Sequence, residues 1–163
     1  MQMEMDIHGA DGVLHTLRSL PHEVVSKRGG PVKLALAKGA RALRDEVKKN
    51  LRVSIAQGPT TRSTGELEKR IIASRGKEPR GTRGERYLVR VKKKDYLNAD
   101  GVLTNPLMTA NLMEYGSVHQ PAKPFIRPAV LSHGAQTINV VTADLVRRVD
   151  QVVTKLAQQN ANR

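Results

Sequence analysis

The chain has 163 residues, which suits a single domain, and it contains no cysteine, so disulfides, a cysteine nucleophile and thiolate metal sites are excluded. Its formal net charge is +13, and the excess lies between residues 26 and 94, which hold 21 basic and six acidic side chains. A charge that localised favours an anionic partner, either nucleic acid or an acidic protein surface.

Aromatic residues make up only 2% of the chain, with one Phe, three Tyr and no Trp. Aromatic rings supply much of the buried area in small domains, so this chain is expected to have a thin core of Val, Leu, Ile and Ala. We therefore expect burial to be completed against neighbouring copies in a homo-oligomer. No apolar run approaches the roughly 20 residues of a membrane helix, and the acidic N-terminus does not resemble a signal peptide. Assembly in a cytoplasm, without a membrane, is the expectation.

Two long helices are predicted. A short helical pattern at 13–20 ends at Pro21, and Pro31 then opens a helix over 31–55 in which apolar residues recur every three or four positions. The same spacing predicts a second long helix over 129–157. Its apolar stripe comprises Ile138, Val141, Leu145, Val149, Val152 and Leu156.

Between these helices the sequence predicts a small antiparallel sheet. Strands are expected near 67–74, 86–93 and 107–115. The first two form a hairpin with a Gly- and Arg-rich tip, and 95–105 is predicted to be an inserted loop. The predicted fold is α+β: a small antiparallel sheet on which a long helix of the N-terminal half and a long C-terminal helix pack. Residues 1–163 form one domain, with mobile ends at 1–10 and 158–163 and flexible loops at 75–86 and 95–105.

No pattern typical of catalysis is present, so we predict no catalytic residue, no metal, no cofactor and no enzymatic activity. His8, His15 and His22 repeat every seven residues, but the glycines and Pro21 among them argue against a helix that would bring them together. No serine occupies a nucleophile-elbow motif, and the paired acidic residues lie in charged, solvated stretches.

The basic middle region has two interpretations that the sequence leaves open. It can be a solvated helix face with charged hairpin edges that prevent strand pairing, or a surface for sequence-independent phosphate contact. We expect the hairpin tip to dock on a neighbouring protein and the bases of helix 31–55 to face DNA. The candidate contact residues are Arg75, Lys77, Arg80, Arg83, Arg86, Lys48 and Lys49.

The most specific stretch runs from Leu112 to Val130 and predicts a rigid corner. Gly116 can turn the chain sharply, the prolines fix an extended connector, and Phe125 is expected to anchor it in the core. Glu114 and Arg127 flank the corner, and we expect them to support it or a contact between subunits. The motif residues are Glu114, Tyr115, Gly116, Pro121, Pro124, Phe125, Arg127 and Pro128.

This stretch resembles the signature of the tailed-phage neck and tail-completion proteins, in which Glu, an aromatic residue and Gly precede a loop and Pro-Phe-hydrophobic-Arg-Pro-Ala. The matching positions here are 114–116 and 124–129. Weaker agreement at Leu20-Pro21, Leu36–Ala40 and Thr64–Leu67 extends the resemblance over most of residues 7–157. The stretches 78–86 and 95–105 depart from the family pattern.

The resemblance implies a structural virion protein for head–tail joining, present at the neck as a ring expected to hold six copies. Its neighbours would be head-closure or connector proteins on one side and the tail terminator or tail tube on the other, with DNA threading the ring. Two alternatives stay open: a tail terminator ring protein and a non-specific nucleic-acid-binding accessory protein. A toxin or small nuclease would need clustered carboxylates or a histidine pair, which the sequence does not suggest.

Overall fold

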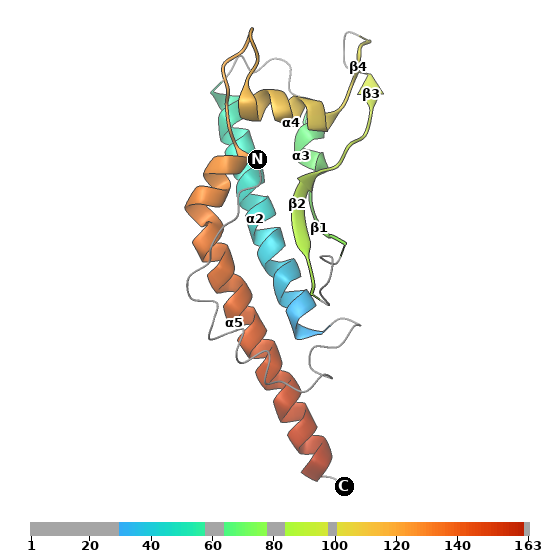
Figure 1. Ribbon diagram of the computed structural model, residues 1–163, viewed down its shortest axis with the longest axis vertical. Helices are drawn as coiled ribbons and strands as arrows, with labels where there is room; N and C mark the ends of the chain where they lie inside the picture. The colour runs from blue at the N-terminus through green and yellow to red at the C-terminus, as the bar shows by residue number, and fades with distance from the viewer. Residues whose placement is uncertain (1–29, 58–63, 78–83, 98–100, 162–163) are drawn as a thin grey trace.

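The computed structural model of the chain describes residues 30–57, 64–77, 84–97 and 101–161 (Figure 1). The predicted helix at 13–20 and the histidines at 8, 15 and 22 lie outside these ranges. The elements in chain order are α2 (Pro31–Ala56), α3 (Glu66–Arg70), β1 (Ile71–Arg75), β2 (Tyr87–Val91), β3 (Tyr96–Leu97), β4 (Leu103–Thr104), α4 (Pro106–Tyr115) and α5 (Ile126–Ala161). The predicted α+β fold, with its two long helices and small antiparallel sheets, is confirmed.

The two long helices α2 and α5 run antiparallel and side by side (Figure 1). Their close approach depends on Gly39, because a Cβ atom at that position would overlap Cγ2 of Val141 on α5. Pro31 occupies the first turn of α2, where the missing N–H would have no helical partner in any case. Among the described residues, no helix is both long enough and apolar enough to span a bilayer.

The strands β1 and β2 form the predicted antiparallel hairpin, with Ile71 opposite Val91 and Arg75 opposite Tyr87. Because side chains alternate along a strand, the odd-numbered residues of both strands share one face. Ile71 is buried on that face, and Val89 and Val91 pack against the same core. As Figure 1 shows, the hairpin lies beside α2 on the side away from α5.

The predicted third strand at 107–115 is wrong, because this segment is the helix α4. The Asn105 side chain accepts a hydrogen bond from the Met108 backbone N–H at 2.9 Å, so it caps the helix, and Pro106 follows at the first helical position. The buried residues Pro106, Ala110 and Glu114 recur every four positions, which is the helical period. Met108 and the pair Leu112-Met113 suggested a strand, but these residues belong to a helix.

Other boundaries also differ from the prediction. The beginning of the strand predicted at 67–74 is the short helix α3, which follows Gly65 in the left-handed conformation (φ 69°). The predicted loop 95–105 contains two short strands, with Tyr96 opposite Thr104. The last helix starts at Ile126 and extends to Ala161, so it includes part of the C-terminal end that we predicted to be mobile.

One cluster of apolar residues forms the main core, where the second half of α2 meets α3, β1, α4 and the start of α5. Phe125 is its one aromatic member and is fully buried. The buried members are Val47, Leu51, Leu67, Ile71, Ala110, Phe125 and Ala129. Phe125 therefore anchors the corner in the core, as the sequence predicted.

Candidate functional site

The corner between α4 and α5 is built around the carboxylate of Glu114, which is only 3% exposed. Its Oε2 accepts hydrogen bonds from the backbone N–H groups of Phe125 (2.9 Å) and Ile126 (3.0 Å). Its Oε1 accepts one from the N–H of Arg127 at 3.0 Å. The first N–H groups of a helix have no partner within the helix, and they form the positive end of its dipole. Glu114 thus caps α5 from the last turn of α4.

Arg127 closes the corner from the solvent side. Its Nε donates to Glu114 Oε1 at 3.2 Å and its Nη2 donates to the Glu114 backbone carbonyl at 3.1 Å. The guanidinium also lies over the ring of Tyr115, 5.1 Å from the ring centroid, which is a cation–π distance. The predicted contact of Glu114 and Arg127 with the corner is therefore present.

Burial by itself would raise the pKa of Glu114, but the hydrogen bonds from Ile126, Phe125 and Arg127 outweigh it and hold this pKa below its ordinary value. The carboxylate consequently stays ionised at neutral pH. A negative charge fixed among backbone donors is a structural cap and has no proton to give to a substrate.

Gly116 makes the turn that leaves α4, with φ at 77°. A Cβ atom there would lie 2.8 Å from the backbone nitrogen of Ala122 and 2.9 Å from the carbonyl oxygen of Gln120, so only glycine fits. The connector then returns to α4, and the Lys123 N–H donates to the Met113 carbonyl at 2.7 Å. Pro121, Pro124 and Pro128 are exposed, and Pro128 lies in the first turn of α5, where a proline is tolerated.

Exposed apolar side chains gather at the same end of the molecule as the corner. The outward face of α4 is apolar, and the β3–β4 hairpin and the connector lie at the same end (Figure 1). We call this surface the apolar end; it comprises Leu97, Leu103, Leu107, Met108, Leu112, Tyr115 and Val118. Exposed apolar patches of this kind are typical of protein–protein contact surfaces. The sequence prediction missed the α4 part because it assigned these residues to a strand.

A second buried carboxylate, Asp144, joins α5 to α2 and was not predicted. Lys38 of α2 donates to Oδ1 at 2.9 Å, Arg147 donates to the same oxygen at 2.8 Å, and Arg148 donates to Oδ2. Hydrogen bonds from Arg148, Lys38 and Arg147 outweigh the effect of burial and hold the pKa of Asp144 far below its ordinary value. The two arginines were foreseeable from their helical spacing, whereas Lys38 lies 106 positions away in the chain.

The described members of the predicted basic contact set are divided between α2 and the β1–β2 hairpin. Arg75 is engaged in the hairpin, where it donates twice to Glu85 at 2.7 Å. Lys49 pairs with Glu46 at 3.6 Å, and Lys48 lies close enough to Glu68 to help lower its pKa, after the larger effect of Arg52. Lys77 and Arg86 are exposed near the hairpin tip, and the predicted Arg80 and Arg83 lie outside the described residues.

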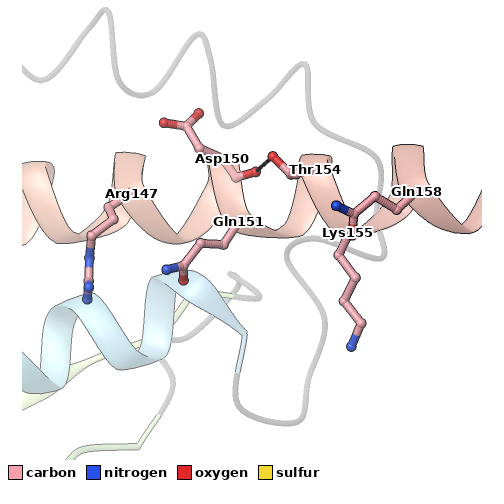
Figure 2. Close-up of a pocket in the computed structure, with 6 residues that line it drawn as sticks. All are labelled: Arg147, Asp150, Gln151, Thr154, Lys155 and Gln158. Carbon is pink, nitrogen blue, oxygen red and sulfur yellow. Dashed lines mark hydrogen bonds between the residues drawn. The ribbon is translucent and has the colours of Figure 1, made fainter.

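No arrangement typical of catalysis is found in the described part of the chain. A surface hollow of about 400 Å³ follows one side of α5, and its lining residues all come from that helix. Figure 2 shows Arg147 and Gln151 pointing toward α2 while Asp150 points away from it. The six lining residues are Arg147, Asp150, Gln151, Thr154, Lys155 and Gln158. Because these side chains diverge, they do not form a binding site.

Ser132, His133 and Glu46 form a chain of polar contacts that superficially resembles a hydrolytic triad. The Ser132 hydroxyl lies 2.8 Å from His133 Nδ1, and His133 Nε2 lies 3.5 Å from Glu46. However, Ser132 donates its proton to the Pro128 carbonyl at 2.6 Å, a bond within the helix. In this arrangement the hydroxyl donates its hydrogen bond to the helix carbonyl and not to the histidine, so the three residues are not arranged as a hydrolytic triad. Within the described ranges, no three His, Asp or Glu residues come together as a metal site.

No protein-family model matches this chain, and neither a curated protein sequence nor a solved structure is significantly similar to it.

Proposed function

We propose that this chain is a structural virion protein of a tailed phage, one copy of a homo-oligomeric neck ring that joins the head connector to the tail. The proposal rests on the structure of the corner between α4 and α5. The residues that resemble the neck-protein signature, Glu114, Phe125 and Arg127, form one hydrogen-bonded unit in which Glu114 and Phe125 are buried. That unit fixes α4 relative to α5, and with it the position of the apolar end.

The apolar end supports contact between subunits. Met108 is 58% exposed and Tyr115 is 72% exposed, and several exposed apolar side chains on one surface are typical of a protein–protein contact. A ring lets each copy cover the apolar end of its neighbour. The head-closure or connector proteins and the tail terminator or tail tube would then meet the two outer faces of the ring.

Two other functions are compatible with parts of the molecule. A tail terminator ring protein would use the same apolar contact between subunits at the end of the tail tube. A non-specific nucleic-acid-binding accessory protein is favoured by the exposed bases of β2 and the segment after it, which have no acidic partner among the described residues.

Deletion of the gene in a phage that encodes this chain tests the proposal. We expect filled heads and separate tails in electron micrographs, because the joint between them is missing, and recovery of joined particles with the wild-type gene in trans. A terminator would instead give tails of irregular length. Normal yields of joined particles from the deletion strain would overturn the proposal.

A matched pair of variants then tests the apolar end. Met108→Glu with Leu112→Glu places two charges on the exposed face of α4, whereas Val146→Glu places one on an equally exposed part of α5. We expect the first variant to fold, by circular dichroism, but to fail in complementation. The second should complement. Complementation by both variants would show that α4 makes no essential contact.

A further inference from the structure

The strand β2 and the residues on either side of it carry five exposed bases, which we call the basic strand surface: Arg86, Arg90, Lys92, Lys93 and Lys94. Arg90 lies opposite Ile72 in the hairpin, on the face turned away from the core residues Val89 and Val91. By the alternation of a strand, Arg86 and Lys92 share that face with Arg90. From Arg86 to Lys92 the chain rises by about 20 Å, at roughly 3.3 Å per residue.

The basic strand surface differs from α2 in how far its charge is neutralised. Four of the seven bases of α2 have a carboxylate within 4.0 Å: Lys38, Arg44, Lys49 and Arg52. In contrast, none of the five bases of the strand surface has a carboxylate at that distance among the described residues. The nearby Glu85 is engaged with Arg75, and Asp95 is the one acid next to the lysine run.

The composition of this surface fits phosphate better than protein. The centres of protein–protein interfaces are depleted of lysine and enriched in aromatic residues, but the strand surface contains three consecutive lysines. Contact with phosphate needs only Lys and Arg side chains, and it is sequence-independent. Tyr87 is half-buried on the opposite face of β2, so its ring is not placed to stack on bases of a single strand.

We infer that the basic strand surface binds the phosphate backbone of duplex DNA without sequence preference, and that α2 contributes little to this binding. The sequence favoured α2 for this role, but four of its seven bases are engaged with carboxylates of α2 itself, α3 and α5. The inference concerns the isolated subunit and does not depend on the neck ring. A ring would multiply each weak contact by its copy number.

The test measures binding of the purified full-length chain to a labelled 24-base-pair duplex by fluorescence anisotropy, at several salt concentrations. The strand variant is Arg90→Gln, Lys92→Gln, Lys93→Gln and Lys94→Gln. The control variant removes the same number of positive charges, one Arg and three Lys, from α2: Lys33→Gln, Arg41→Gln, Lys48→Gln and Lys49→Gln. All eight side chains are at least partly exposed, so both variants are expected to keep the helical content of the wild type.

We expect the strand variant to bind at least tenfold more weakly than the wild type at about 50 mM salt. The plot of log K against log salt should also become less steep, with a slope smaller in magnitude by about 2 to 4, since each phosphate contact contributes about 0.9. The control should stay within about threefold of the wild type. Duplexes rich in A·T and in G·C should bind equally. If the strand variant fails to fold, the pair Arg90→Gln and Lys92→Gln should lower the magnitude of the slope by about half as much.

Three results would overturn the inference. In the first, the strand and control variants lose affinity equally, which indicates a net-charge effect alone. In the second, the strand variant binds DNA as tightly as the wild type; where the strand variant does not fold, the same result for the two-substitution variant counts. In the third, the strand variant loses affinity for a polyglutamate peptide but keeps its affinity for DNA, which indicates that the surface docks an acidic protein.

Discussion

Two buried carboxylates among the described residues, Glu114 and Asp144, are held by different kinds of hydrogen-bond donor. Glu114 accepts hydrogen bonds from three backbone N–H groups at the start of α5. Asp144 accepts hydrogen bonds from three side chains, Lys38, Arg147 and Arg148, whose exposed fractions are 51%, 59% and 27%. Backbone donors cannot move away if their acceptor is lost, whereas exposed side chains can turn into water. The cap at Glu114 is therefore expected to matter more than the ion cluster at Asp144, although that cluster contains more charges.

The largest effect should come from the packing that supports the Glu114 cap. Phe125 is fully buried in the core, and its N–H is one of the three donors to Glu114. Phe125→Ala should lower the free energy of unfolding by about 3–5 kcal/mol, because it removes a buried ring and leaves a cavity. Chemical denaturation monitored by circular dichroism measures this. Tyr115→Ala, at a position 72% exposed, is the control and should cost less than about 1 kcal/mol. A cost below about 1 kcal/mol for Phe125→Ala would mean that the corner does not depend on the ring.

The next effect concerns the Glu114 cap directly. Glu114→Gln keeps the shape but turns one acceptor oxygen into an NH₂ group facing backbone donors. We expect a loss of about 1–3 kcal/mol, because at least one buried N–H is left without an acceptor. Asp45→Asn, which removes a carboxylate that is 61% exposed, should change stability by less than about 0.5 kcal/mol. Equal losses of unfolding free energy for the two variants would show that the Glu114 cap stabilises the fold no more than an exposed carboxylate does.

The same comparison predicts a dependence on pH. The pKa of Glu114 is lower in the folded state than its ordinary value, so its stabilising effect is fully present above the unfolded pKa of about 4.3. The effect is lost as the pH falls through the lowered pKa, because the cap must then take up a proton. Unfolding measured from pH 7 to pH 3 should show the wild type and Glu114→Gln converging at the acid end. A constant difference across that range would contradict the ionised cap.

The two carboxylates also show what the sequence could predict. Glu114 and its donors lie within 13 residues of one another, in a motif with a lone Phe and three prolines, so the corner was foreseeable. The contact between Asp144 and Lys38 depends on how α2 and α5 align, which the spacing of apolar residues in each helix does not determine. Gly39 permits the close approach of α2 to Val141 of α5, and no local sequence pattern identifies this role.

The same distinction between local and long-range information explains the error at α4. The capping residue Asn105 and Pro106 are local signals for a helix start, and they were present in the sequence. A strand was predicted instead because Met108, Leu112 and Met113 are apolar and Gly116 ends the segment. In the structure the buried face is formed by Pro106, Ala110 and Glu114, and the large apolar residues point outward. The α4 part of the apolar end was missed because these residues were assigned to a strand.

The smallest effect is expected at Asp144. Asp144→Asn keeps a side chain of the same size but removes the charge that holds Lys38, Arg147 and Arg148 together, so three cations are left close to one another. Because all three side chains reach solvent, they can separate and hydrate, and the loss of stability should be smaller than for Glu114→Gln.

Salt screens repulsion between exposed cations but does not replace a lost acceptor for a buried N–H. The cost of Asp144→Asn should therefore shrink between about 0.05 and 0.5 M NaCl, while the cost of Glu114→Gln stays constant. Thermal unfolding at the two salt concentrations, with the exposed Asp150→Asn as the control on the same helix, measures both. A cost at Asp144 that equals the cost at Glu114, or that does not respond to salt, would mean that the side-chain donors are held as rigidly as backbone, and the contrast between the two carboxylates would be wrong.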